Sequence, residues 1–259
     1  MNIDRELKRH FVGRLIEDNR RIDGRGFDDI REISIETNVI DVKAEGSAHV
    51  KLGNTDVLCG IKLLTGEPYP DQLESGVMMT AAELVPIADP TFETGRPGED
   101  AIELARVVDR AIRESHMIDL EKLVIEPGET VWIVSIDLHI LNHDGNLLDA
   151  SNLAAVAALK TAWVPKYEDG TVIREEKSMD LPISNVPISF TFAKIGSGIV
   201  LDPILDEEFA MDARFTVGTT GKRLHAMQKG ETGAFKPDEI SIMVDKAMAK
   251  YKDVKKLIK

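Results

Sequence analysis

Three arginines on one predicted helix form the pattern with the clearest potential for chemistry. Helical spacing across 99–116 places Arg106, Arg110 and Arg113 on one face, opposite the apolar residues. A guanidinium presents a fixed fork of donors to phosphate oxygens, so the row predicts contact with successive phosphates of a single nucleic-acid strand. The alternative is a solvated face on which all three arginines form ordinary ion pairs along the helix. The acidic partners would be Glu103, Asp109 and Glu114.

A cluster of carboxylates follows a predicted strand in the last third of the chain. Its members are Asp202, Asp206, Glu207, Glu208 and Asp212. Oxygen ligands of this kind hold magnesium for phosphoryl chemistry, so one interpretation is a metal-dependent nuclease or phosphotransferase that uses Asp202, Asp206, Glu208 and Asp212. Acids also favour the first turn of a short helix. We therefore expect no metal and no cofactor at this cluster.

Three further patterns favour structural roles. His139 and His143 are four residues apart but span a strand end and a turn, where this spacing does not join two metal ligands. The run 218–222 has its glycines too close together for a phosphate loop and lies between predicted strands, which indicates a hairpin turn. Cys59, the only cysteine, lies in an apolar strand, which predicts a place in the core and excludes an internal disulfide.

Periodicity and turn residues predict the elements that must position these groups. Strands are expected at 33–40, 44–52, 55–64, 77–85, 131–141, 188–195, 199–202, 213–217 and 224–229. Helices are expected from Ile3, with Ile3, Leu7, Phe11 and Leu15 as an apolar stripe, at 99–116, from a cap at Asp149 or Ser151 through Trp163, at 206–211, and from Pro237.

The clustering of strands indicates an α+β fold of two related sub-domains, since strands do not alternate strictly with helices. We expect an N-terminal helix and turn at 1–27, a first sub-domain at 28–165, an exposed, charged excursion and linker at 166–187, and a second sub-domain at 188–259.

Composition limits the class of protein. Apolar residues make up 43% and charged residues 30% of the 259 residues, which excludes a disordered, collagen-like or coiled-coil chain. The net charge of −13 repels polyanions, so any contact with nucleic acid must be local. No apolar run approaches the ~18 residues of a membrane helix. We expect a soluble, cytoplasmic protein that does not bind membranes.

Several segments, in order over nearly the whole chain, resemble the RNase PH superfamily. They are 21–25, 46–55, 105–110, 144–150 and 201–208. Within the superfamily the chain is most similar to the larger, non-catalytic ring subunit of the archaeal exosome. The resemblance implies an RNase PH-like fold, ribosomal protein S5 domain 2-like, with mixed sheets and packed helices. It also implies a hexameric ring, a trimer of heterodimers with a catalytic RNase PH-like subunit, under a cap of RNA-binding subunits.

The departures from the active pattern concern phosphate. The resemblance implies an arginine in active members where this chain has Asp100, and a hydroxyl residue followed by arginine where it has Leu147 and Leu148. An aspartate repels phosphate and leucines offer no donor, so phosphorolysis is not expected. Of the family's acidic positions, Asp202 fits the first, and Glu208 stands where the active pattern has aspartate. We expect no catalytic residue and no activity of the chain alone.

The resemblance places the helix at 99–116 beside the central channel, near the active site of the partner. It implies that Arg106, Arg110 and Arg113 contact the backbone of single-stranded RNA, which carries no base information and suits 3′→5′ degradation of any sequence. The expected function is to structure the catalytic partner and to bind RNA. A purely structural ring subunit remains the alternative.

Overall fold

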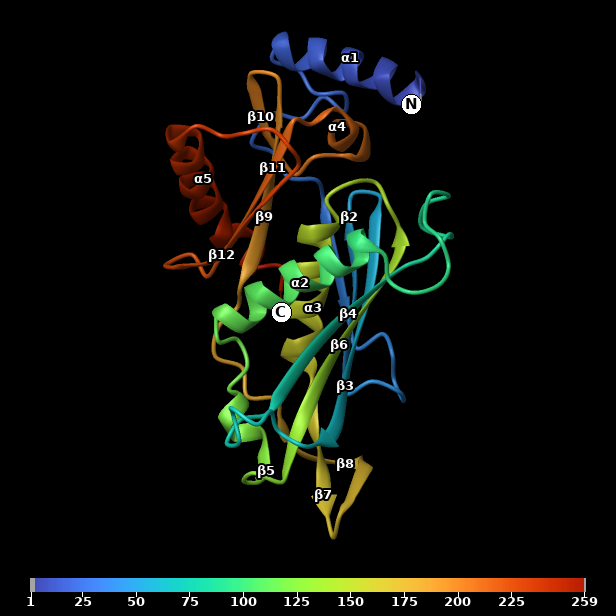
Figure 1. Ribbon diagram of the computed structural model, residues 1–259, viewed down its shortest axis with the longest axis vertical. Coiled ribbons are helices and arrows are strands. Elements are labelled where there is room, and N and C mark those ends of the chain that lie inside the picture. The colour runs from blue at the N-terminus through green and yellow to red at the C-terminus, as the bar shows by residue number, and fades with distance from the viewer. Residues whose placement is uncertain (1–2, 259) are drawn as a thin grey trace.

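The computed structural model describes residues 3–258, and the side chains of residues 8–258. Figure 1 shows an elongated molecule with the N-terminal helix at one end and a hairpin at the other. In chain order the elements are α1 (Ile3–Glu17), β1 (Ile33–Thr37), β2 (Gly46–Leu52), β3 (Thr55–Gly66), β4 (Val77–Leu84), α2 (Glu99–Glu114), the 3-10 helix η1 (Leu120–Leu123), β5 (Val124–Glu126), β6 (Thr130–Asn142), α3 (Leu147–Thr161), β7 (Trp163–Glu168), β8 (Thr171–Asp180), β9 (Ile188–Ile195), β10 (Gly198–Leu201), α4 (Leu205–Ala210), β11 (Ala213–Thr219), β12 (Leu224–Gly230) and α5 (Pro237–Lys255).

Two larger sheets organise the fold. The first has the order β1-β2-β3-β6-β4, with β5 paired to β6, and the second has the order β10-β9-β11-β12. The strand pairs are antiparallel except for β4, which runs parallel to β6. Every second residue of β3 is buried from Thr55 to Leu63, as the alternation of apolar residues requires. The α+β class predicted from the clustered strands is confirmed.

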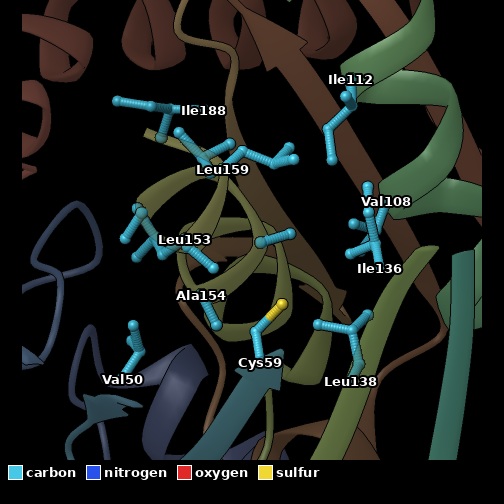
Figure 2. Packing of buried hydrophobic residues seen from close by; sticks show 14 of the residues in the cluster. Val50, Cys59, Val108, Ile112, Ile136, Leu138, Leu153, Ala154, Leu159 and Ile188 are labelled. Carbon is cyan, nitrogen blue, oxygen red and sulfur yellow. The ribbon is translucent and has the colours of Figure 1, made fainter. Parts of the chain in front are cut away.

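Helix α3 packs between the two sheets and forms the centre of the molecule. It contacts β2 and β3 on one side and β9 on the other, and every residue from Leu148 to Leu159 is buried. Its many alanines allow this close approach, and Gly46 in β2 permits it, because a Cβ there would lie 2.6 Å from the carbonyl oxygen of Ala158. Figure 2 shows Cys59 of β3 in this core near Ala154, and the cysteine is fully buried, as predicted for the lone cysteine.

Helix α2 lies beside α3 and covers the edge of the first sheet at β4. Its buried face includes Leu104, Val108 and Ile112, and Figure 2 shows Val108 and Ile112 directed toward Ile136 of β6. The prediction of an amphipathic helix here is confirmed. Because the buried face is packed in the core, the orientation of the exposed face is fixed.

The N-terminal helix packs differently from the prediction. Phe11, expected in the apolar stripe, is 54% exposed, whereas Val12 and Ile16 are buried in a small separate cluster with residues of β9 and α4. The stripe residues Ile3 and Leu7 lie outside the side chains that the structure describes. The helix thus rotates by about one residue (~100°) relative to the predicted stripe.

Two further predictions need correction near α3. The cap is Asn146, whose oxygen accepts a hydrogen bond from the backbone of Asp149, so neither Asp149 nor Ser151 caps the helix. Asn146 has φ 54°, a left-handed conformation that asparagine tolerates better than most residues. The helix ends at Thr161, and Trp163 and Pro165 belong to β7. The charged excursion is largely a β7-β8 hairpin, and its outer strand is exposed.

Within residues 3–258, no helix is both long and apolar enough to cross a membrane.

Candidate functional site

The exposed face of α2 carries the three predicted arginines. Arg106, Arg110 and Arg113 are all exposed, and all three line a groove of about 700 Å³ between α2 and the second sheet. The groove also reaches Thr80 on β4. The helix positions them because its opposite face is anchored in the core, so the spacing of one turn between Arg106 and Arg110 is rigid.

Only one of the three arginines is held by an acid of its own helix. Arg113 donates from Nε and Nη2 to the two carboxylate oxygens of Asp109, both at 2.9 Å, and from Nη2 to the carbonyl oxygen of Met78. The hydrogen bonds to Asp109 raise the pKa of the Arg113 guanidinium above its ordinary value. Arg113 is therefore committed to a local ion pair.

Arg106 and Arg110 are not committed in this way. Within the side chains of residues 8–258, neither has a hydrogen-bond or ion-pair partner. The alternative, in which helix-surface ion pairs occupy all three arginines, does not hold for these two. Part of the reason lies far away in sequence, because Glu103 accepts a hydrogen bond of 2.7 Å from Arg214 of β11 and is drawn away from Arg106.

A second cavity lies where the N-termini of α2 and α3 meet α4. It has a volume of about 470 Å³, and its lining includes Asp100, Leu147, Leu148 and Glu208. The structure thus brings together the positions that the resemblance assigned to phosphate and acid. Asp100 is an exposed carboxylate in the first turn of α2, where a helix favours negative charge. Leu148 is buried, and both leucines add apolar surface where a phosphate would need donors.

Glu208 and Arg214 give this cavity unusual electrostatics. Burial raises the pKa of Glu208 to about 7. The hydrogen bond of 2.8 Å that one of its oxygens accepts from the backbone of Asn146 lowers the pKa, but by less than burial raises it. Arg214 also lines the cavity, and its Nη2 donates a hydrogen bond to Glu103. The cavity therefore offers carboxylates and apolar surface, while its cations already have acidic partners: Arg9 also lines it and pairs with Asp212.

Asp202 is buried and saturated by donors. Oδ2 accepts from Nη1 of Arg25 at 2.9 Å and from the backbone and Nε of Arg31 at 2.8 and 2.9 Å. Oδ1 accepts from Arg31 Nη2 and Asn146 Nδ2, both at 2.7 Å. Burial alone would raise its pKa, but the hydrogen bonds and charge of Arg31 hold the pKa of Asp202 below its usual value.

Three more members of the acidic cluster are also paired with basic residues. Asp206 pairs with Lys8, Glu207 with Arg21 and Asp212 with Arg9. Among the described residues, no group of three or more His, Cys, Asp or Glu side chains is arranged to hold a metal ion. The geometry does not favour the metal-dependent nuclease.

The remaining sequence candidates fall into structural roles. His139 faces Glu83 across neighbouring strands at 3.3 Å, and His143 stacks on Phe92. The run 218–222 covers the end of β11 and most of the hairpin turn to β12, as predicted. Two features were not predicted. Arg21, Arg25 and Arg31 bind the acidic cluster, and the arginines of the segment 20–31 were the available signal. Gln228 lines the groove of Arg106 and Arg110, and no sequence pattern indicates this.

Comparison with known proteins agrees with this arrangement. Residues 29–165 match domain 1, and residues 185–250 match domain 2, of the 3′ exoribonuclease family. Exosome complex component Rrp42 of Thermococcus gammatolerans is 52% identical over 258 residues, which cover 97% of this chain and 94% of the relative.

Two solved structures have the same fold over the whole chain. A chain of the Archaeoglobus fulgidus exosome with RNA bound to the active site is 46% identical, with a TM-score of 0.93 and coverage of 100% of both chains. A chain of an archaeal exosome core is 43% identical, with a TM-score of 0.88 and coverage of 99% and 98%. The chain belongs to the 3′ exoribonuclease family and contains both of its domains in order.

Proposed function

We propose that this chain is a non-catalytic ring subunit of an exosome that degrades RNA 3′→5′ by phosphorolysis. In this role it structures a catalytic RNase PH-like partner, in a trimer of heterodimers below a cap of RNA-binding subunits, and contributes contacts to single-stranded RNA. The similarity to exosome components named Rrp42 supports the proposal that the chain is part of an exosome. The RNA bound in the related Archaeoglobus fulgidus complex supports the proposal that the substrate is RNA. The proposed location is the cytoplasm.

We infer that the isolated chain has no activity because the cavity at Asp100 is unsuited to holding phosphate. Phosphorolysis needs inorganic phosphate held in place, and charged or neutral donors are the groups that hold it. Asp100 would repel the phosphate, and the side chains of Leu147 and Leu148 donate nothing. The carboxylate that the family uses, at Asp202, is occupied by two arginines and an asparagine. The cavity is therefore unsuited to the reaction.

The unpaired guanidiniums of Arg106 and Arg110 are the observation that carries the role in RNA binding. An arginine without an acidic partner has its N–H donors free for a phosphate. Arg113 must first break its ion pair with Asp109. Two such cations on an exposed ridge are a local exception in a chain with net charge −13. Contacts of this type carry no base information, as an enzyme that degrades any sequence requires.

The salt dependence of RNA binding tests this role. Each phosphate contact contributes about 0.7 to the slope of log affinity against log salt for a single strand. We expect Arg106→Ala and Arg110→Ala each to weaken RNA binding by the chain, copurified with its exosome partners, and to flatten the slope by about 0.7. Arg20→Ala is the control, because Arg20 is exposed in the turn after α1. Unchanged affinity and slope in both variants would leave only a structural role.

A further inference from the structure

Gln228 is a half-buried side chain that lies beside the unpaired arginines. It belongs to β12, the edge strand of the second sheet, and lines the same groove as Arg106 and Arg110. Its neighbour in register is Thr216 of β11, which also lines the groove. Within the side chains of residues 8–258, the amide of Gln228 has no hydrogen-bond partner. A half-buried amide without a partner retains two donors and an acceptor for a ligand.

The face that carries Gln228 is turned toward α2. Gly218 and Ala226 pair in register on this face, and a Cβ at Gly218 would lie 3.5 Å from the Cβ of Ala111. Here the helix and the sheet touch, and the groove lies along that contact. Gln228 and the ridge of Arg106 and Arg110 therefore face one cavity of about 700 Å³, large enough for a nucleoside.

The charges of α2 restrict how a strand can lie on it. Glu99 and Glu114, the first and last residues of the helix, line the groove at its two ends. A strand running along the helix would bring its phosphates near one of these carboxylates, which repels them. The uncompensated positive charge is confined to the middle turn, at Arg106 and Arg110. The charge pattern favours phosphate contacts at this middle turn.

We infer that Gln228 contacts the ribose of the RNA strand, with its amide hydrogen-bonded to a 2′-hydroxyl, while Arg106 and Arg110 hold the two adjacent phosphates. This inference rests on the proposed function and deepens it. The 2′-hydroxyl both donates and accepts, which matches the two kinds of atom in the amide, and it is present on every ribonucleotide. Gln228 therefore adds a preference for RNA over DNA without selecting a base.

The test compares RNA with DNA. Binding of labelled oligo(rA) and oligo(dA) is measured with the full chain copurified with its exosome partners, without phosphate and magnesium so that no strand is degraded. We expect Gln228→Ala to lower RNA affinity about three- to ten-fold, the effect of one neutral hydrogen bond, with DNA affinity and the salt slope unchanged. Gln72→Ala is the matched control, an exposed glutamine outside this groove.

The outcomes separate the two proposals. If Arg106→Ala and Arg110→Ala weaken binding and Gln228→Ala does not, the inference about Gln228 is overturned and the proposed function stands. Equal losses on RNA and DNA also contradict a 2′-hydroxyl contact, and a loss on oligo(rA) but not on oligo(rU) would indicate that the amide contacts a base. If the arginine variants bind as the wild type does, the proposed role in RNA binding fails, and only the structural role remains. A melting temperature within about 2 °C of the wild type shows that the Gln228 variant is folded.

Discussion

Arg21 and Glu207, 186 residues apart in the sequence, form a bidentate ion pair whose side chains are both fully buried. Nε of Arg21 donates to Oε1 of Glu207 at 2.8 Å, and Nη2 donates to Oε2 at 2.6 Å. The remaining donors of the guanidinium reach the carbonyl oxygens of Leu201 and Asp202. The pair joins the segment before the first sheet to α4 in the second sub-domain.

Loss of one partner of this pair should be costly, because the other charge stays buried without compensation. We predict that Glu207→Ala lowers the free energy of unfolding by about 3–5 kcal/mol, measured by urea denaturation. The exposed pair of Asp253 and Lys256 is the control, and Asp253→Asn should leave the free energy of unfolding close to that of the wild type. A cost for Glu207→Ala as small as that of the control would show that the pair does not hold this N-terminal segment on the second sub-domain.

Asp109 keeps Arg113 from contacting a ligand, so its removal should add a phosphate contact. We predict that Asp109→Asn raises the RNA affinity of the assembled complex and steepens the salt slope by about 0.7, because Arg113 joins Arg106 and Arg110 on the same ridge. Titrations at several salt concentrations measure both quantities. Asp119→Asn, which frees Lys122 outside the groove, is the control. A slope that stays at the wild-type value would mean that RNA does not reach Arg113.

The raised pKa of Glu208 predicts a pH dependence of stability. Between its ordinary value of 4.5 and the folded value of about 7, the folded protein holds a proton that the unfolded chain has lost. The contribution of Glu208 is therefore fully present below pH 4.5 and is lost as the pH rises to about 7. Glu208→Gln removes this dependence, since an amide does not titrate and its oxygen still accepts from Asn146.

Denaturation at a series of pH values measures the effect. The stability of Glu208→Gln relative to the wild type should increase with pH across this interval, by up to about 1.4 kcal/mol per pH unit. For Glu74→Gln, at an exposed loop position, the curve of stability against pH should run parallel to that of the wild type. Parallel curves for Glu208→Gln and the wild type would contradict the raised pKa.

Local patterns predicted most of the fold. The alternation in β3 and the amphipathic period of α2 arise because each element buries one face. Such patterns can be recognised in the sequence without knowing which elements pack together. The cap at Asn146 was not predicted, because its side chain also donates a hydrogen bond to Asp202, a residue 56 positions away. The N-terminal stripe was wrong because the small cluster beneath it selects Val12 and Ile16.

The site depended more on distant contacts. The spacing of Arg106, Arg110 and Arg113 placed them on one face, but spacing could not show which of them would remain unpaired. Arg214 partly decides that outcome. It lies on a strand more than 100 residues later in the chain and donates a hydrogen bond to Glu103, which is then not paired with Arg106. The cluster at Asp202 looked like a possible metal site because its arginine partners lie far earlier in the chain. Side-chain pairing between distant segments is the information that a single sequence lacks.

The most direct measurement is the release of ADP from poly(A) with phosphate and magnesium present. The samples are this chain alone, its catalytic partner alone, and the copurified complex with and without Arg106→Ala and Arg110→Ala. We predict no release by the chain alone, more release by the complex than by the partner, and a loss of that gain in the double variant. Release by the chain alone would contradict the interpretation of Asp100, Leu147 and Leu148, and an unchanged rate in the double variant would contradict the RNA contacts.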